Sequence, residues 1–314
     1  MDSIYERTLK VEELLDIDVV DSEYTVDEMF KEINAGDVTF DLMTVNLSNV
    51  RKFINIGAVV DFYDLDGIDL SMPWWDQNAQ QKLSVAGKLF YTLSDFLITG
   101  IDNARAVYFN KKLHEDLGLD DLYTMARDGT WTLDEMRKMG LVAVADLNGD
   151  GKNTRDDRYG MLCWNATSFY EAYLTSSDAE IMKQSESGIP YFYCFEQRFV
   201  DVYTRLLDIF STNNMTYLEN DLNLFMDGHA LSTTWTMYGA TRLREMNTDF
   251  GIIPLPKYDL NQESYWHVSP NLHALMVPVA TKDELRTGII LEALAYYSSV
   301  CYSENAVIPT YFEL

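Results

Sequence analysis

The stretch RAVYFNKKLHEDL, residues 105–117, decides the predicted fold because an apolar strand runs directly into a helix within it. Its consecutive apolar side chains, Ala106 to Phe109, are typical of a buried strand. The mostly charged residues that follow predict a helix near residues 111–117. A strand that leads at once into a helix indicates an α/β protein.

The same alternation of helices and strands continues on the N-terminal side of this stretch. Thr25 and Glu28 form a capping box that opens a predicted helix, and Gly36 ends it. An apolar run over residues 40–45 predicts a strand, and Asn46 begins the polar turn after it. These elements support the α/β prediction.

Further helix and strand signals lie on the C-terminal side. Thr132 with Glu135 and Thr281 with Glu284 match the capping box again, and the second pair opens a long predicted helix. Residues 272–277 form an apolar run that predicts a strand. The chain contains no internal repeat and no low-complexity linker.

Composition sets limits on the function. The chain of 314 residues is long enough for two domains of ordinary size. Its 50 acidic and 24 basic residues give a formal charge of -26, which repels phosphate backbones and anionic lipids. We therefore expect neither a nucleic-acid partner nor binding to a membrane surface.

Motifs that would indicate an enzyme are missing from the sequence. It contains no GxSxG, HExxH, P-loop or GxGxxG pattern. Cys163, Cys194 and Cys301 have no metal-binding spacing, so we expect them to be small apolar residues. Many carboxylate pairs could serve a glycosidase, but nothing singles one out, so an enzyme remains the less favoured alternative.

Six segments, in this order and spacing over most of the chain, resemble the extracellular solute-binding proteins of family 1, which serve carbohydrate-type ABC importers. The segments are Val107–Leu113, Gly129–Glu135, Asp146–Lys152, Arg158–Gly160, Phe225–Ala230 and Phe250–Lys257. Each motif alone is weak, and their combination makes the resemblance specific.

The resemblance implies a periplasmic-binding-protein type II-like fold, in which two α/β lobes joined by a hinge hold a ligand in the cleft between them. The first lobe would comprise residues 1–107 and 271–314, and the second lobe residues 108–270. Family members usually begin with a lipoprotein signal and a first strand, and they continue beyond the long helix. We therefore expect a fragment truncated at both ends, with a second lobe that lacks its C-terminal portion.

The same resemblance implies a function without turnover. The protein would bind a sugar or oligosaccharide outside the cell, as a cell-surface lipoprotein, and deliver it to the permease subunits of an ABC importer. We expect the signal and the lipid anchor to lie outside this chain. Receptors of this kind need no cofactor. A peptide or another small solute is the alternative ligand within the same class, and a calcium-dependent surface module is a further alternative.

Sugar recognition needs aromatic faces for the C–H side of a pyranose and planar polar groups for its hydroxyls. Candidates are aromatic and polar residues that follow predicted strands, flank the predicted lobe crossings or, for Trp74 and Trp75, stand beside polar side chains after a turn. Each of them could instead be a core or loop residue. They are Asn46, Ser48, Trp74, Trp75, Tyr91, Asp95, Trp164, Asn165, Trp235, Tyr238, Trp266 and Asn271. If the adjacent Trp74 and Trp75 lie in a strand, they point opposite ways, so at most one faces the ligand.

The segment from Asp146 to Asp157 matches the calcium-loop pattern at most positions. A Gly at position 151 permits the sharp turn, and Asp157 stands where an EF-hand has Glu. The predicted ligands of a structural calcium ion are Asp146, Asn148, Asp150, the Lys152 carbonyl, Thr154 through water, and Asp157. A metal-free turn is the alternative, but crowded carboxylates without a cation would repel one another, which favours calcium.

Overall fold

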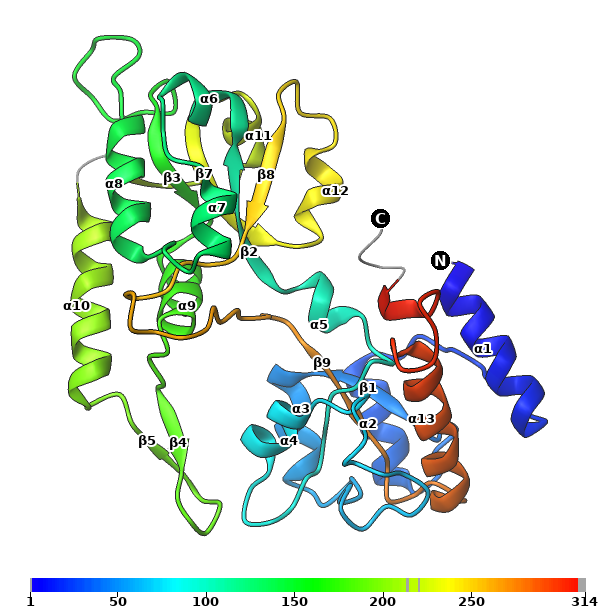
Figure 1. Cartoon of the computed structure of the whole chain (residues 1–314). Helices are drawn as coiled ribbons and strands as arrows, with labels where there is room; N and C mark the ends of the chain where they lie inside the picture. Colours follow the sequence, from blue (N-terminus) through cyan, green and yellow to red (C-terminus); the bar gives the residue numbers. More distant parts are fainter. Residues whose placement is uncertain (1, 213–214, 220, 310–314) are drawn as a thin grey trace. The chain divides into compact units, whose positions relative to one another are not determined.

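The computed structural model describes residues 2–212, 215–219 and 221–309, which form two compact units (Figure 1). Within the described residues, the first unit comprises residues 2–100, 184–190 and 271–309, and the second comprises residues 101–183 and 191–270. The boundaries expected from the sequence are residues 107 and 270. The boundary expected near residue 107 instead lies between residues 100 and 101, because the strand that contains residue 107 pairs along its length within the second unit.

The first unit combines helices with a two-stranded antiparallel sheet in the order β1-β9. Helix α5 lies where the two units divide. The elements are α1 (Asp2–Leu15), α2 (Val26–Ala35), β1 (Met43–Asn46), α3 (Leu47–Ile54), α4 (Gln77–Leu83), α5 (Thr99–Asp102), β9 (His273–Met276) and α13 (Glu284–Ser298).

Strand β9 organises the core of the first unit. Ala274 and Met276 pack on one side with α2, α3 and β1. Leu275 and Val277 point to the other side, where they pack with residues of α13. This alternation is the period of two that a strand imposes on its side chains. Because both faces are covered, β9 is a nearly continuous apolar run in the sequence.

Two of the three predicted capping boxes differ from the structure. Thr25 and Glu28 form the complete box at α2. Thr132 accepts the backbone N–H of Glu135 at 3.4 Å, but the Glu135 carboxylate turns to Lys138 instead of completing the box. The prediction for Thr281 was wrong.

The long helix α13 begins at Glu284, and Asp283 is its N-cap. The Asp283 carboxylate accepts the N–H of Arg286 at 3.0 Å. The hydroxyl of Thr281 instead donates to the Asp41 carboxylate at 3.1 Å. A carboxylate one residue before the helix therefore displaces the threonine as the cap.

The second unit is built on a five-stranded sheet in the order β6-β3-β7-β2-β8, and a separate pair of short strands, β4 and β5, follows α9. Residues 184–190 of that pair group with the first unit. The elements are β2 (Arg105–Asn110), α6 (Lys111–Asp116), α7 (Leu122–Arg127), α8 (Leu133–Ala143), β3 (Tyr159–Cys163), α9 (Ala166–Ser176), β4 (Met182–Gln184), β5 (Pro190–Phe192), α10 (Gln197–Ser211), β6 (Thr216–Leu218), α11 (Leu222–Met226), β7 (Ala230–Thr236), α12 (Gly239–Leu243) and β8 (Phe250–Ile253).

The stretch over residues 105–117 forms β2 and α6, as predicted. Strand β2 is antiparallel to both β7 and β8, whereas β3 is parallel to β6 and β7. Val107 packs with α7, α8, α9 and α10 on one face of the sheet. Tyr108 packs with α11 and α12 on the other face. The sheet is therefore covered by helices on both faces.

Among the helices of the described residues, none is long and apolar enough to cross a membrane.

Helix α13 lies so close to the backbone at Asp66 that a larger residue at position 288 is expected to destabilise the fold. A Cβ at Gly288 would lie 2.0 Å from the Asp66 carbonyl oxygen. Gly to Ala inside a helix usually stabilises by about 0.5–1 kcal/mol, but overpacking costs about 1–3 kcal/mol. We therefore expect Gly288→Ala to lower the free energy of unfolding, measured in urea.

Gly100→Ala in α5 is the matched control, because the nearest atom to its added Cβ is Leu272 Cδ2 at 3.8 Å, an ordinary contact. We expect this variant to be at least as stable as the wild type. A Gly288→Ala variant of unchanged stability would contradict the close packing of α13 on the Asp66 backbone.

Candidate functional site

Two indoles stack where the parallel strands β3 and β7 end. Trp164 directly follows β3, and Trp235 lies near the end of β7. In the register of β3 and β7, Leu162 pairs with Thr233. Trp164 and Trp235 each lie two residues after this pair, so they stand side by side where these neighbouring strands end. Their ring centroids are 5.7 Å apart and their planes differ by 12°. We call Trp164 and Trp235 the indole pair.

The indole pair has an inner and an outer member. Trp235 is half-buried, and a Cβ at Gly239 would lie 2.3 Å from its Cδ1 atom. Glycine is therefore required at position 239 for the ring to lie there. Trp164 is 52% exposed, so it offers the accessible indole surface of the pair. The carboxyl ends of strands are where ligands bind in open α/β sheets.

Other predicted ligand residues lie at the same end of this sheet. Asn165 is exposed and caps α9, where its Oδ1 accepts the N–H of Ser168 at 2.8 Å. Tyr238 is 59% exposed and follows β7. Trp266 is 46% exposed and lies two residues before Val268. The Val268 carbonyl accepts the backbone N–H of Arg105 at 2.9 Å. Aromatic and amide groups thus surround the ends of β3 and β7.

Arg105 is a residue of this region that the sequence analysis missed. Its Nη1 donates to the Ser168 carbonyl at 2.6 Å, and its Nη2 lies 3.1 Å from Glu171 Oε2. The Arg105 side chain is only 10% exposed, and burial lowers the pKa of its guanidinium. The sequence feature that could have identified Arg105 is a basic residue at the start of an otherwise buried strand.

Asn46, Ser48 and Asn271 come together at one end of the sheet of the first unit. Asn46 pairs with His273, and its Oδ1 accepts the N–H and the hydroxyl of Ser48 at 3.0 and 2.7 Å. Asn271 is exposed, two residues before β9, with a positive φ of 59°. The structure therefore gathers these three polar residues, although Asn46 already uses its side-chain oxygen locally.

Trp74 and Trp75 are both tied to Glu292 of α13. Their Nε1 atoms donate to the two oxygens of that carboxylate at 3.0 and 2.9 Å. They do not point opposite ways, because they are not in a continuous strand: Trp74 lies in a turn, and Trp75 forms an isolated β-bridge with Ser94. Trp75 is 1% exposed and belongs to the core, so we leave it out of the candidate site. Trp74 is half-buried and packs against Tyr296, with ring centroids 5.0 Å apart.

Tyr91 and Asp95 face the interior of the first unit. Tyr91 is half-buried beside the β1–β9 core, and burial raises the pKa of its hydroxyl. The Asp95 carboxylate bonds to the side chain of Ser299, and its backbone N–H donates to the Trp74 carbonyl at 2.9 Å. Both residues therefore have structural partners within this unit.

The predicted calcium loop closes on its own backbone. Asp146 accepts the N–H groups of Gly149 and Gly151 at 2.7 and 2.9 Å, and these bonds hold the pKa of its carboxyl below the usual range. Asp157 is buried and accepts the N–H of Thr154 at 2.9 Å. Backbone donors thus offset part of the carboxylate repulsion that favoured calcium. Over the described ranges, no three His, Cys, Asp or Glu side chains gather as they would around a metal ion.

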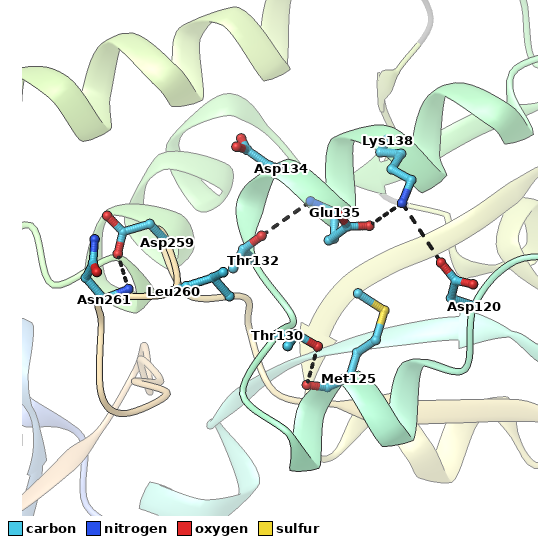
Figure 2. A pocket seen from close by; sticks show the side chains of 10 residues that line it. All are labelled: Asp120, Met125, Thr130, Thr132, Asp134, Glu135, Lys138, Asp259, Leu260 and Asn261. Atoms are coloured by element: carbon cyan, nitrogen blue, oxygen red, sulfur yellow. Dashed lines mark hydrogen bonds and ion pairs between the residues drawn. The ribbon is translucent and has the colours of Figure 1, made fainter.

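A hollow of about 750 Å³ opens elsewhere on the second unit (Figure 2). Asp120, Asp134, Glu135 and Asp259 line it, together with Lys138, whose Nζ lies 2.8 Å from Glu135 Oε2. None of the predicted ligand residues is among the ten that line it, and none of those ten is aromatic. A hollow of this kind offers a pyranose ring no stacking surface, so we do not place the sugar site there.

The comparisons with known proteins establish the fold. No family profile and no curated protein matches the chain. The cyclo/maltodextrin-binding protein complexed with maltotetraose has a TM-score of 0.66 and 15% identity, over 97% of this chain and 72% of that chain. This likeness confirms the predicted periplasmic-binding-protein type II-like α/β fold, and it confirms the resemblance to solute-binding proteins at the level of the fold.

Two further structures show the range of solutes bound by proteins of this fold. The ABC substrate-binding protein Lmo0181 from Listeria monocytogenes, in complex with cycloalternan, has a TM-score of 0.56 and 14% identity, over 95% of this chain and 72% of that chain. UgpB from Mycobacterium tuberculosis, in complex with glycerophosphocholine, has a TM-score of 0.57 and 16% identity, over 97% and 73%. The fold is thus compatible with more than one class of solute.

The burial of Asp95 predicts that its contribution to stability depends on pH. Burial raises the pKa of this carboxyl above its ordinary value of 3.8. At a pH above the raised pKa, the ionised Asp95 therefore destabilises the folded state relative to the unfolded state. Below pH 3.8 the group is protonated in both states and the cost disappears. We expect Asp95→Asn to have a higher Tm than the wild type at pH 7, and we expect this difference to vanish as the pH falls below 3.8.

The control is Asp64→Asn, because Asp64 is exposed. Its Tm should follow that of the wild type at every pH. An Asp95→Asn variant that is no more stable than the wild type at pH 7 would show that the Asp95 carboxylate is well solvated or well paired.

Proposed function

We propose that this protein is a receptor that binds a sugar or oligosaccharide and delivers it to an ABC importer. The observation that carries the proposal is the indole pair, with Trp164 half-exposed at the carboxyl ends of β3 and β7. The C–H face of a pyranose is apolar and matches an indole in size and flatness. Structures of the same fold hold maltotetraose and cycloalternan.

The charge of the chain supports an uncharged ligand. The formal charge is -26, and a field of this sign disfavours phosphorylated or acidic sugars. Arg105 is a basic residue that pairs with Thr236 at the end of β7, and Glu171 forms an ion pair with it. A neutral sugar needs no basic partner, so its binding does not suffer because Arg105 is already paired with Glu171.

The proposed activity is reversible binding, without turnover and without a cofactor. The partners would be the permease subunits of the importer, and the protein would work outside the cell as a lipid-anchored receptor. The alternative is a peptide or another small solute in the same fold, which the glycerophosphocholine complex of UgpB keeps open. A panel that includes neutral sugars, glycerophosphocholine and peptides separates these ligands.

We also propose a structural calcium ion in the loop from Asp146 to Asp157. The donors predicted from the sequence are all oxygen atoms, which calcium prefers. The loop leads directly into β3, and the hydroxyl of Tyr159 donates to the Thr154 carbonyl at 2.6 Å. His229 Nδ1 lies 2.9 Å from the Asp157 carbonyl oxygen. An ion in this loop would therefore stabilise the start of β3 and β7.

The sugar proposal predicts the effect of removing the outer indole. The sugar of the panel that raises the Tm most should bind Trp164→Ala about tenfold more weakly, a loss of about 1.4 kcal/mol, by isothermal titration calorimetry. Phe195→Ala is the matched control, because Phe195 is an exposed aromatic residue of the same unit. It should bind the sugar as the wild type does. Equal affinities of wild type and Trp164→Ala would rule out Trp164 as the stacking surface.

The calcium proposal predicts a metal-dependent Tm. Chelation should lower the Tm of the wild type, and calcium in excess over its dissociation constant should restore it. Asp146→Ala should lose this dependence, whereas Asp156→Asn should retain it, because Asp156 is exposed and outside the predicted ligand set. A wild-type Tm that is the same in calcium and in chelator would refute the calcium site.

A further inference from the structure

We infer that Arg105 is a positioning residue for Trp164, which it holds in place through the first turn of α9. The inference rests on the proposed function, since it concerns the indole that would contact the sugar. Arg105 does not need to touch the ligand for this role. Its guanidinium instead fixes the short segment that carries Trp164.

The segment between β3 and α9 consists of Trp164 and Asn165 alone. Its downstream end is held at Ser168 from two sides. The Ser168 N–H donates to Asn165 Oδ1 at 2.8 Å, and the Ser168 carbonyl accepts from Arg105 Nη1 at 2.6 Å. Arg105 also pairs with Glu171 one turn further along α9. A displacement of this first turn would move Trp164 with it.

The upstream end of the segment is held by the sheet. Strand β3, which leads into the segment, pairs with β7 in parallel. Helix α9, which follows the segment, also contacts β7, because the Tyr173 hydroxyl lies 2.6 Å from Thr234 Oγ1. Arg105 begins β2, where it pairs with Thr236 on the other side of β7. Its side chain therefore links β2 to α9 across the strand that carries Trp235. The two indoles are fixed to one another through this arrangement.

The chemistry of Arg105 favours a positioning role over a stabilising one. Its side chain is 10% exposed, so its desolvation is costly, while its partner Glu171 is 43% exposed and well solvated. Because Glu171 is solvated, replacing Arg105 alone by an apolar residue leaves no buried unpaired charge, and we expect it to cost little stability. What an apolar residue cannot replace is the directed bond to the Ser168 carbonyl.

The test separates geometry from stability. Two stacked indoles couple their electronic transitions, and when their in-plane transition dipoles are not parallel they give a paired positive and negative band in far-ultraviolet circular dichroism. Trp164→Phe and Trp235→Phe assign this band, because either change removes it. We expect Arg105→Met to weaken the band and to reduce affinity for the best-binding sugar about tenfold, with a Tm close to that of the wild type. Arg127→Met, at an exposed arginine of α7, should change neither.

Arg105→Met with an intact band and unchanged affinity would overturn the inference. If this variant does not unfold cooperatively, Arg105→Lys carries the test with the same two outcomes, because lysine keeps the charge but replaces the two separate guanidinium nitrogens that bond to Ser168 and Glu171 with a single nitrogen. Glu171→Gln is expected to retain the band, since the bond to Ser168 remains. A weakened band in a protein that binds no sugar of the panel would support the positioning role and count against the proposed function instead.

Discussion

The parallel pairing of β3 with β7 is the constraint on which the proposed site depends. Because Leu162 pairs with Thr233, Trp164 and Trp235 arrive together at the same edge of the sheet. A slip of one residue in this register would send one indole to the opposite face and abolish the stack. The helices that cover both faces hold the register by burying the alternate side chains of both strands.

The remaining parts of the second unit follow from this pairing. Helix α9 begins at Ala166, two residues after Trp164, so its first turn decides where the outer indole lies. Gly239 leaves space for the inner indole, and Arg105 ties the first turn of α9 to β2. The same end of the sheet carries Asn165 and Tyr238, which are both exposed. A rigid strand pair thus supports a small set of accessible side chains, as binding sites require.

Local patterns predicted the elements, and long-range contacts decided what the sequence could not predict. The apolar run that leads into charged residues predicted β2 and α6, and the box at Thr25 predicted α2. The cap at Thr281 was wrong because Asp283 competes for the same helix end. Trp164 and Trp235 were each predicted as ligand candidates, but their stacking depends on a strand register between distant segments. The bond of Trp75 to Glu292 likewise joins residues 217 positions apart.

The most direct test of the account is a crystal structure of the protein with the oligosaccharide that raises its Tm most. We expect a pyranose ring stacked on the exposed surface of Trp164, with its carbon atoms within about 4 Å of the indole, and with Trp235 still stacked behind it. A sugar bound in the acidic hollow of Figure 2, or elsewhere with Trp164 free in solvent, would contradict the central claim.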